Sequence, residues 1–155
     1  MRHVCNNLRM TAAVSDLAEL LRSMQPELHD GVFVYSSIPG DRDLGALPVV
    51  VMVREPEGVT VVVAEHEAER AGLPVLFRAA WITLTVCSDL QAVGLTAAFA
   101  AALADAGISC NVVAGAYHDH LFVPVERGAD ALRALWHLQQ TATSLPPGGS
   151  SRTIA

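Results

Sequence analysis

Lysine is absent from this sequence, and all ten of its basic residues are arginines. The absence excludes Schiff-base lysines, lysine general bases and the P-loop G-x-x-x-x-G-K-[ST], because each needs a primary ammonium on a flexible stem. Charged residues make up only 17% of the chain, and the net charge is −6. The sequence therefore has no run of positive charge to neutralise phosphates, and we expect no nucleic-acid partner.

Cysteine motifs and long apolar runs are also missing. The three cysteines, Cys5, Cys87 and Cys110, are widely spaced and form no C-x-x-C motif, which favours reduced, buried thiols in a cytoplasmic protein. The longest stretch without a charged residue or histidine, residues 90–104, is shorter than the ~20 residues that span a bilayer. The N-terminus lacks the apolar segment of a signal peptide. We expect a cytoplasmic protein with no membrane partner.

Apolar residues are abundant, at 52% of the 155 residues. This composition supplies a core, and the length allows either one domain or two small fused ones. In the first half, the runs 49–53 and 59–63 are rich in valine and are joined by a Pro/Gly turn, which predicts a hairpin of strands buried on both faces. Around this hairpin we predict a helix over 13–24 capped by Ser15 or Asp16, a strand over 32–35, a loop over 38–43, and a helix over 65–71 that ends at Gly72.

The second half predicts the order β-α-β-β-α. Its elements are a strand over 79–87, a helix over 89–106 that ends at Gly107, strands over 109–117 and 120–125, a helix over 126–138, and a disordered tail from 141. Ser88 and Gln91 form a capping box for the first of these helices, which places Gly94 inside it. This order gives five of the six elements of the ferredoxin-like βαββαβ fold. The missing last strand must come from elsewhere, and 32–35 offers a spare one.

The fold class we expect is therefore α+β, with two tandem ferredoxin-like units of which the second lacks its own last strand. We place the units at 12–76 and 77–141, with flexible tails at 1–11 and 142–155.

Four separated clusters carry a resemblance to a known family. They are Arg54-Glu55-x-Glu57-Gly58, then Leu84-Thr85-x2-Ser88-x-Leu90, then Gly107-Ile108-x-Cys110-Asn111, and Tyr117-His118-Asp119-His120. In this order they resemble the small bacterial proteins built from tandem ACT domains, which are relatives of the regulatory ACT domains of aspartokinase. The resemblance implies a βαββαβ fold, a small-molecule ligand that is typically an amino acid, a homodimer, and neither catalysis nor a cofactor.

The resemblance also implies where a ligand lies, namely against the loop from the first strand into the first helix and against the following strand. Carried over by position, these residues are Ser88, Asp89, Leu90, Val93, Gly94, Leu95, Asn111 and Val112. A helix N-terminus suits a carboxylate, and Asp89 can meet an ammonium. The residues alone leave an alternative, in which Ser88 and Gln91 only cap the helix and Asn111 bonds a neighbouring loop.

Arg54 is a further candidate, because it follows five apolar strand residues and can bind a carboxylate through two hydrogen bonds. The alternative is a salt-bridged hairpin tip. His118 and His120 share one face of a strand and suit a metal, but no further ligand is fixed by spacing, and Asp119 suits a turn. We expect no metal. The function we expect is non-catalytic binding or sensing of a small molecule, with a ligand-free interaction module or a small metal-binding protein as alternatives.

Overall fold

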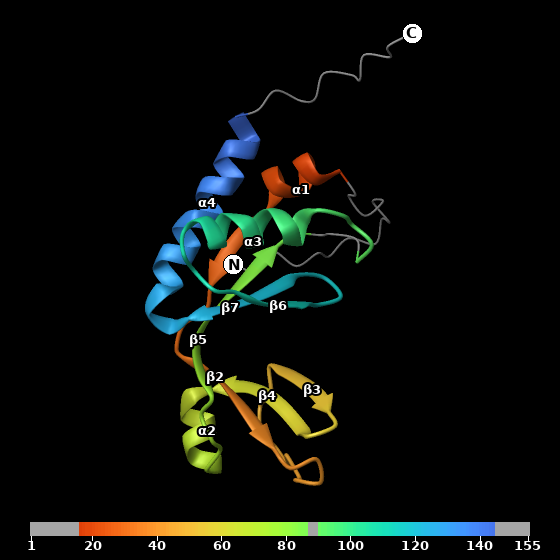
Figure 1. The fold of residues 1–155 in the computed structure, drawn as a ribbon, viewed down its shortest axis with the longest axis vertical. Helices are drawn as coiled ribbons and strands as arrows, with labels where there is room; N and C mark the ends of the chain where they lie inside the picture. The colour runs from red at the N-terminus through yellow and green to blue at the C-terminus, as the bar shows by residue number, and fades with distance from the viewer. Residues whose placement is uncertain (1–15, 87–89, 145–155) are drawn as a thin grey trace.

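The computed structural model describes residues 16–86 and 90–144, which contain four α-helices and seven strands. In chain order these are α1 (Leu17–Ser23), β1 (Gln25–Leu28), β2 (Phe33–Ile38), β3 (Val51–Glu55), β4 (Gly58–Ala64), α2 (Glu65–Ala71), β5 (Phe77–Thr85), α3 (Leu95–Asp105), β6 (Asn111–Ala114), β7 (Asp119–Pro124) and α4 (Gly128–Ser144), shown in Figure 1. Predictions on Ser15, Cys5, Cys87 and the segments 1–11 and 145–155 lie outside the described residues.

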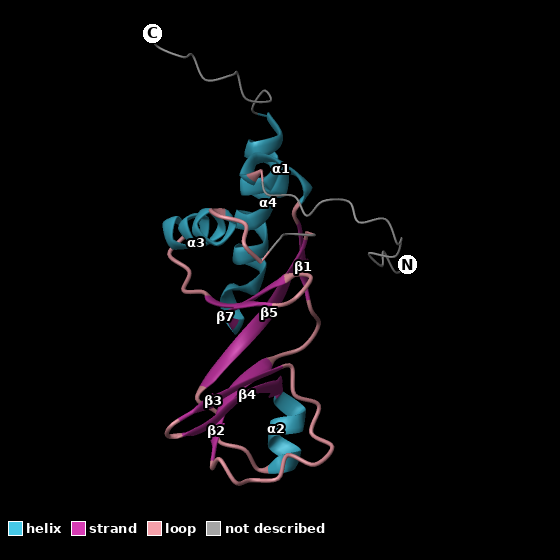
Figure 2. Ribbon diagram, turned by 90° about the vertical axis from the view of Figure 1, so that its right-hand side faces the viewer, coloured by secondary structure: helices cyan, strands magenta, loops and turns pink. Residues whose placement is uncertain are grey.

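The strands form one antiparallel sheet in the order β3-β4-β2-β5-β7-β6, with β1 also paired to β5. The nine-residue strand β5 pairs with β2 through its first residues and with β1 through its last. Its other edge pairs with β7. In Figure 2, β5 runs between the end of the molecule that holds α2 and the end that holds the other three helices.

This sheet contains two ferredoxin-like units that share β5. The first unit has the strand order β5-β2-β4-β3 and carries α2, and the second has the order β1-β5-β7-β6 and carries α3 and α4. Each is the order last, first, third, second of a βαββαβ fold. The prediction that the second unit takes its last strand from elsewhere is confirmed. The strand is residues 25–28, which pair with residues 82–85, and the spare strand predicted at 32–35 belongs to the first unit instead.

The first unit lacks the first of the two helices of this fold. Residues 39–50 connect β2 to β3 as irregular chain, where the second unit has α3. Hydrogen bonds between residues close in sequence hold this connection. Among them, Leu47 N–H donates to the Leu44 carbonyl at 2.9 Å, and Gly45 N–H donates to Asp43 Oδ1 at 2.9 Å. The loop predicted over 38–43 is therefore the start of a longer one.

Three apolar clusters form the core. One packs α1, α3 and α4 on β5 and β7, and a second packs α2 and the 39–50 connection on β2 and β4. The third consists of strand residues from both units together with Val50. Within it, the rings of Tyr35 and Phe122 meet edge to face at 5.7 Å, although β5 lies between their strands. The third cluster therefore joins the two units across the shared strand.

Most of the predicted elements in the first half are confirmed. Asp16 caps α1 by accepting hydrogen bonds from two backbone N–H groups, α2 covers the predicted residues with Gly72 after it, and β3 pairs with β4. The prediction that both hairpin strands are buried on both faces is wrong for β3, where Met52 is 44% and Val53 47% exposed. Because β3 is the edge strand, its side chains have neighbours from only one adjacent strand, β4, on either face of the sheet.

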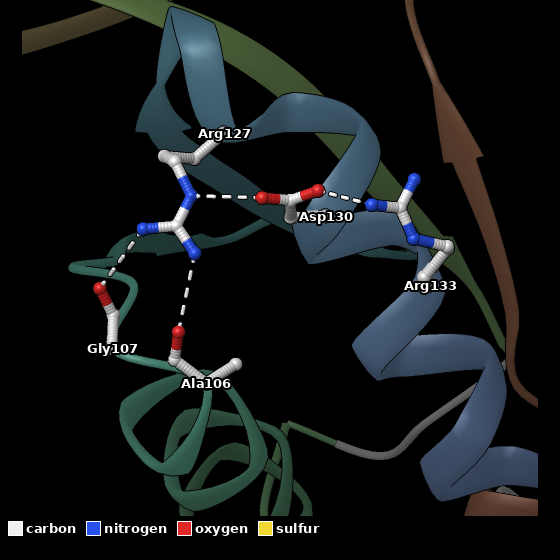
Figure 3. A network of polar contacts seen from close by, with 5 residues as sticks. All are labelled: Ala106, Gly107, Arg127, Asp130 and Arg133. Atoms are coloured by element: carbon white, nitrogen blue, oxygen red, sulfur yellow. Dashed lines mark hydrogen bonds and ion pairs between the residues drawn. The ribbon is translucent and has the colours of Figure 1, made fainter.

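The helix α4 is tied to the end of α3 by an arginine. Arg127 donates to the carbonyls of Ala106 at 3.2 Å and Gly107 at 3.4 Å, and also to Asp130 (Figure 3). A cation suits the carbonyl end of a helix. Asp130 also pairs with Arg133. The helix α4 continues to Ser144, so the tail predicted from 141 is wrong for residues 141–144.

Leu20 tests whether α1 belongs to the core of the second unit. Its side chain is fully buried in the cluster with α3 and α4, so Leu20→Ala should lower the free energy of unfolding by about 2–5 kcal/mol. Urea unfolding measures the loss. Leu76→Ala serves as the control, because Leu76 is 66% exposed and should cost little. Equal effects of the two substitutions would contradict this packing.

Candidate functional site

The loop before α3 presents apolar side chains to solvent. Leu90 is 70% and Val93 85% exposed. The helix predicted to begin at residue 89 begins instead at Leu95, with Gly94 as its N-terminal cap residue at a φ of 103°. A Cβ on Gly94 would lie 2.9 Å from the Leu17 side chain of α1. The placement of Gly94 inside the helix is therefore wrong, and glycine suits both the positive φ and the close approach.

The cap residue of α3, Gly94, has no side chain with which to cap the helix. The first hydrogen bond within the helix runs from Ala98 N–H to the Gly94 carbonyl at 2.9 Å. The backbone N–H groups before Ala98 therefore have no acceptor within the helix. The first turn holds no acidic residue. Ser88 and Asp89, predicted to lie here, are outside the described residues. The exposed helix end favours an anionic group such as a carboxylate.

The structure separates the other predicted site residues from one another. Leu95 is 3% exposed and lies in the first apolar cluster, against which Val112 also packs. Asn111 is exposed, and alternation along β6 directs it to the opposite face from Val112. Arg54 is exposed on β3, the opposite edge of the sheet from β6. Leu95 and Val112 are thus brought together, whereas Asn111 and Arg54 lie apart from them.

In the histidine segment, His118 closes the turn, whereas Asp119 and His120 begin β7. The turn between β6 and β7 is closed by Gly115 N–H donating to the His118 carbonyl at 2.8 Å, and Asp119 is the first residue of β7, at 8% exposure. The assignment of Asp119 to the turn is therefore wrong. Among residues 16–86 and 90–144, no three His, Cys, Asp or Glu side chains come together as a metal site.

A polar and aromatic cluster that the sequence did not reveal lies at the junction of the two units. The His29 ring stacks on Trp81 with centroids 3.7 Å apart, and its Nε2 lies 2.7 Å from the Thr83 hydroxyl. That hydroxyl is 3.0 Å from Nδ1 of His120, to which Trp81 Nε1 donates at 3.2 Å. Alternation along β5 places Trp81 and Thr83 on one face, but no local pattern pairs them with His29.

Burial lowers the pKa of both histidines of this cluster. For His120, the neighbouring His118 and His29 lower it further, and Asp119 opposes. For His29, Glu27 and Asp30 oppose the effect of burial. Because Trp81 can only donate, Nδ1 of His120 must accept, which requires a neutral ring. Burial also raises the pKa of Asp119.

Two regions of the chain match family models described as ACT domain, residues 12–80 and 77–136. A crystal structure from Vibrio cholerae, described as a protein of unknown function and possible transport protein, is 48% identical with a TM-score of 0.72, and the match covers 80% of this chain and 96% of that one. The chain belongs to the ACT-domain family. This ACT protein therefore contains two ACT units in tandem, as the sequence predicted.

More distant solved structures share the fold of this ACT protein. The regulatory subunit of aspartate kinase from Thermus thermophilus has a TM-score of 0.58 at 13% identity, over 75% of this chain and 97% of that one. A protein from Agrobacterium tumefaciens has a TM-score of 0.59 at 14% identity, over 75% and 89% of the two chains. No curated protein matches. Within the described residues, no helix is both long enough and apolar enough to span a bilayer.

The histidine cluster predicts that stability falls with acid. Because the folded pKa values of His29 and His120 lie below the ordinary 6.5, the unfolded chain binds more protons near and below pH 6.5, and stability should drop from pH 7 to pH 5. Urea midpoints measure this drop. The raised pKa of Asp119 acts in the opposite direction at lower pH.

His120→Asn tests the assignment, because the Asn oxygen can replace Nδ1 as an acceptor but cannot take up a proton. Between pH 7 and pH 5, the urea midpoint of the variant should fall less than that of the wild type. His137→Asn, at an exposed position on α4, should leave the drop unchanged. An undiminished drop in His120→Asn would contradict the cluster as its source.

Cys110 should be unreactive. Burial raises the pKa of its thiol to about 11, and only the thiolate is a nucleophile. At pH 8, alkylation of Cys110 by iodoacetamide should be about a hundredfold slower in the folded protein than in urea. Peptide mapping separates Cys110 from the other cysteines. Equal rates in both states would rule out a buried thiol.

Proposed function

We propose that this chain is a cytoplasmic, non-catalytic regulatory protein that binds an amino acid at the N-terminal end of α3. The observation that supports the proposal most is the tandem pair of ACT units. ACT domains are regulatory small-molecule-binding domains, and the solved structures of similar fold include regulatory subunits of aspartate kinase. The amino acid as ligand and the α3 site are the parts that the proposal adds.

The geometry at α3 supports a carboxylate ligand. The first N–H groups of the helix have no intrahelical acceptor, so they provide donors and a positive end, and the adjacent Leu90 and Val93 provide exposed apolar surface. In this proposal, the helix end binds the carboxylate and the loop contacts the side chain. Asn111 and Arg54 lie on other surfaces, so they would contact this ligand only from a second copy of the chain.

The homodimer is part of the same proposal. The edge strand β3 has unpaired backbone groups along one side, with Met52 and Val53 about half exposed, and such an edge can pair with a second chain. This observation also favours the second candidate function, a protein interaction module without a ligand. The two candidates differ in whether any amino acid stabilises the protein.

A thermal-shift screen against the twenty amino acids tests the proposed function. A ligand at 100 times its Kd adds ~2.7 kcal/mol to the free energy of unfolding, so the Tm should rise for at least one amino acid. Thr96→Asp places a negative charge in the exposed first turn of α3 and should weaken binding roughly fivefold. Thr96→Asn, without the charge, should bind like the wild type.

Absence of any Tm rise across the screen would reject ligand binding. The interaction module would replace it if the protein then elutes as a dimer that Val53→Arg converts to a monomer. A Tm rise that Thr96→Asp leaves unchanged would keep ligand binding and reject the α3 end as its site.

A further inference from the structure

The first unit has a groove where the second unit has a packed helix pair. In the second unit, α3 lies against α4 over the sheet. In the first unit, the irregular connection 39–50 replaces the equivalent of α3, and α2 is the equivalent of α4. Between the connection and α2 lies an open groove of about 250 Å³, lined by Leu44, Ala46, Leu47, Glu67, Arg70 and Ala71. The helix missing from the first unit thus leaves a hollow.

The walls of this groove are held in place. Arg42 donates to the Ala71 carbonyl at 2.8 Å and so ties the connection to the end of α2. Leu44, Leu47 and Ala71 pack their inner sides against the second apolar cluster. The groove therefore has an apolar floor fixed to the core.

One side of the groove carries a pair of opposite charges. The Glu67 side chain is only 10% exposed, and its carboxylate pairs with Arg70 and with His66 Nε2, the latter at 3.2 Å. The Arg70 side chain is 71% exposed. An ionised carboxylate accepts about four hydrogen bonds and a guanidinium donates five, so both groups keep capacity for a ligand. A molecule with its own positive and negative group fits such a pair.

A buried hydroxyl lies in the layer beneath. Ser36 is fully buried, and its Oγ has no hydrogen-bond partner among the described residues. It shares a strand face with Val34 and Ile38, which belong to the cluster that Leu44 and Leu47 cover. Ser36 is not among the residues that line the groove, so its hydroxyl takes no part in the binding proposed below.

We propose that this groove binds a small zwitterion with an aliphatic side chain, that is, a free α-amino acid of the leucine or valine class. Its ammonium pairs with Glu67, its carboxylate with Arg70, and its side chain packs on Leu44 and Leu47. The volume lies below the ~300–1,000 Å³ of drug-sized pockets, which limits the ligand to a small molecule. This is a second site, separate from α3, and it shares with the proposed function only the class of ligand.

Three ligands separate the contributions of the two charges to binding. Calorimetry measures their affinities, and changes in amide chemical shifts locate where they bind. L-leucine carries both charges, whereas isoamylamine lacks only the carboxylate and 4-methylpentanoate lacks only the ammonium. We expect leucine to bind at least tenfold more tightly than either analogue and to shift amides of residues 44–47 and 67–71. If an analogue binds as tightly as leucine, the assignment of both charges is overturned.

Two variants locate the site. Glu67→Gln removes the partner of the ammonium and should weaken leucine binding at least tenfold, whereas Glu69→Gln, at an exposed position of the same helix, should not. Ala46→Trp adds bulk at an exposed position of the connection, fills the groove and should abolish binding. It serves as the deciding variant if Glu67→Gln lowers the Tm of the ligand-free protein.

The outcomes separate this groove from the α3 site. Leucine binding that persists in both variants, with shifts confined to residues 90–98, overturns the groove and leaves the proposed function intact. Shifts confined to the groove support the groove, and the α3 site then depends on the other amino acids of the screen. No binding of leucine or valine at millimolar concentration overturns the groove, while the proposed function then depends on the remaining amino acids of the screen.

Discussion

The hydrogen bonding of β5 on both of its edges is the constraint on which the rest of this structure depends. Its first residues complete the sheet of the first unit, and its whole length is the first strand of the second. Because one strand serves both sheets, the units cannot move as separate bodies without breaking its ladder. The inter-unit cluster around Phe122 and the His29–Trp81 stack both lie along this strand.

The sequence predicted the fold well where the signals were local. The helix cap at Asp16, the hairpin of β3 and β4, and the glycine after α2 depend on signals within a few residues, and these three predictions are confirmed. The origin of the second unit's last strand was not local, since Gln25 pairs with Thr85. No pattern within residues 25–28 specifies a partner so far along the chain. The exposure of Met52 also depends on sheet order, which a run of valines does not encode.

The candidate site was less predictable, for physical reasons that differ between residues. Ser88 and Gln91 fit a capping box by spacing, yet α3 starts later because Gly94 adopts a positive φ against Leu17. The groove beside Glu67 arises from a helix that the first unit lacks, and an absent element has no motif. The His29, Thr83 and His120 contacts join three strands or strand ends that only the folded sheet brings together.

Because β1 precedes the first unit but completes the sheet of the second, the two ACT units are not independent modules. The family matches lie end to end and meet near residue 77, which suggests two modules that could be expressed, swapped or evolved one at a time. A cut at that point, however, would separate the second unit from β1 and take from the first the strand that closes its sheet. Neither half would keep a complete sheet. The two family matches follow one another along the chain, but the sheet that they form is continuous, so each half depends on strands of the other.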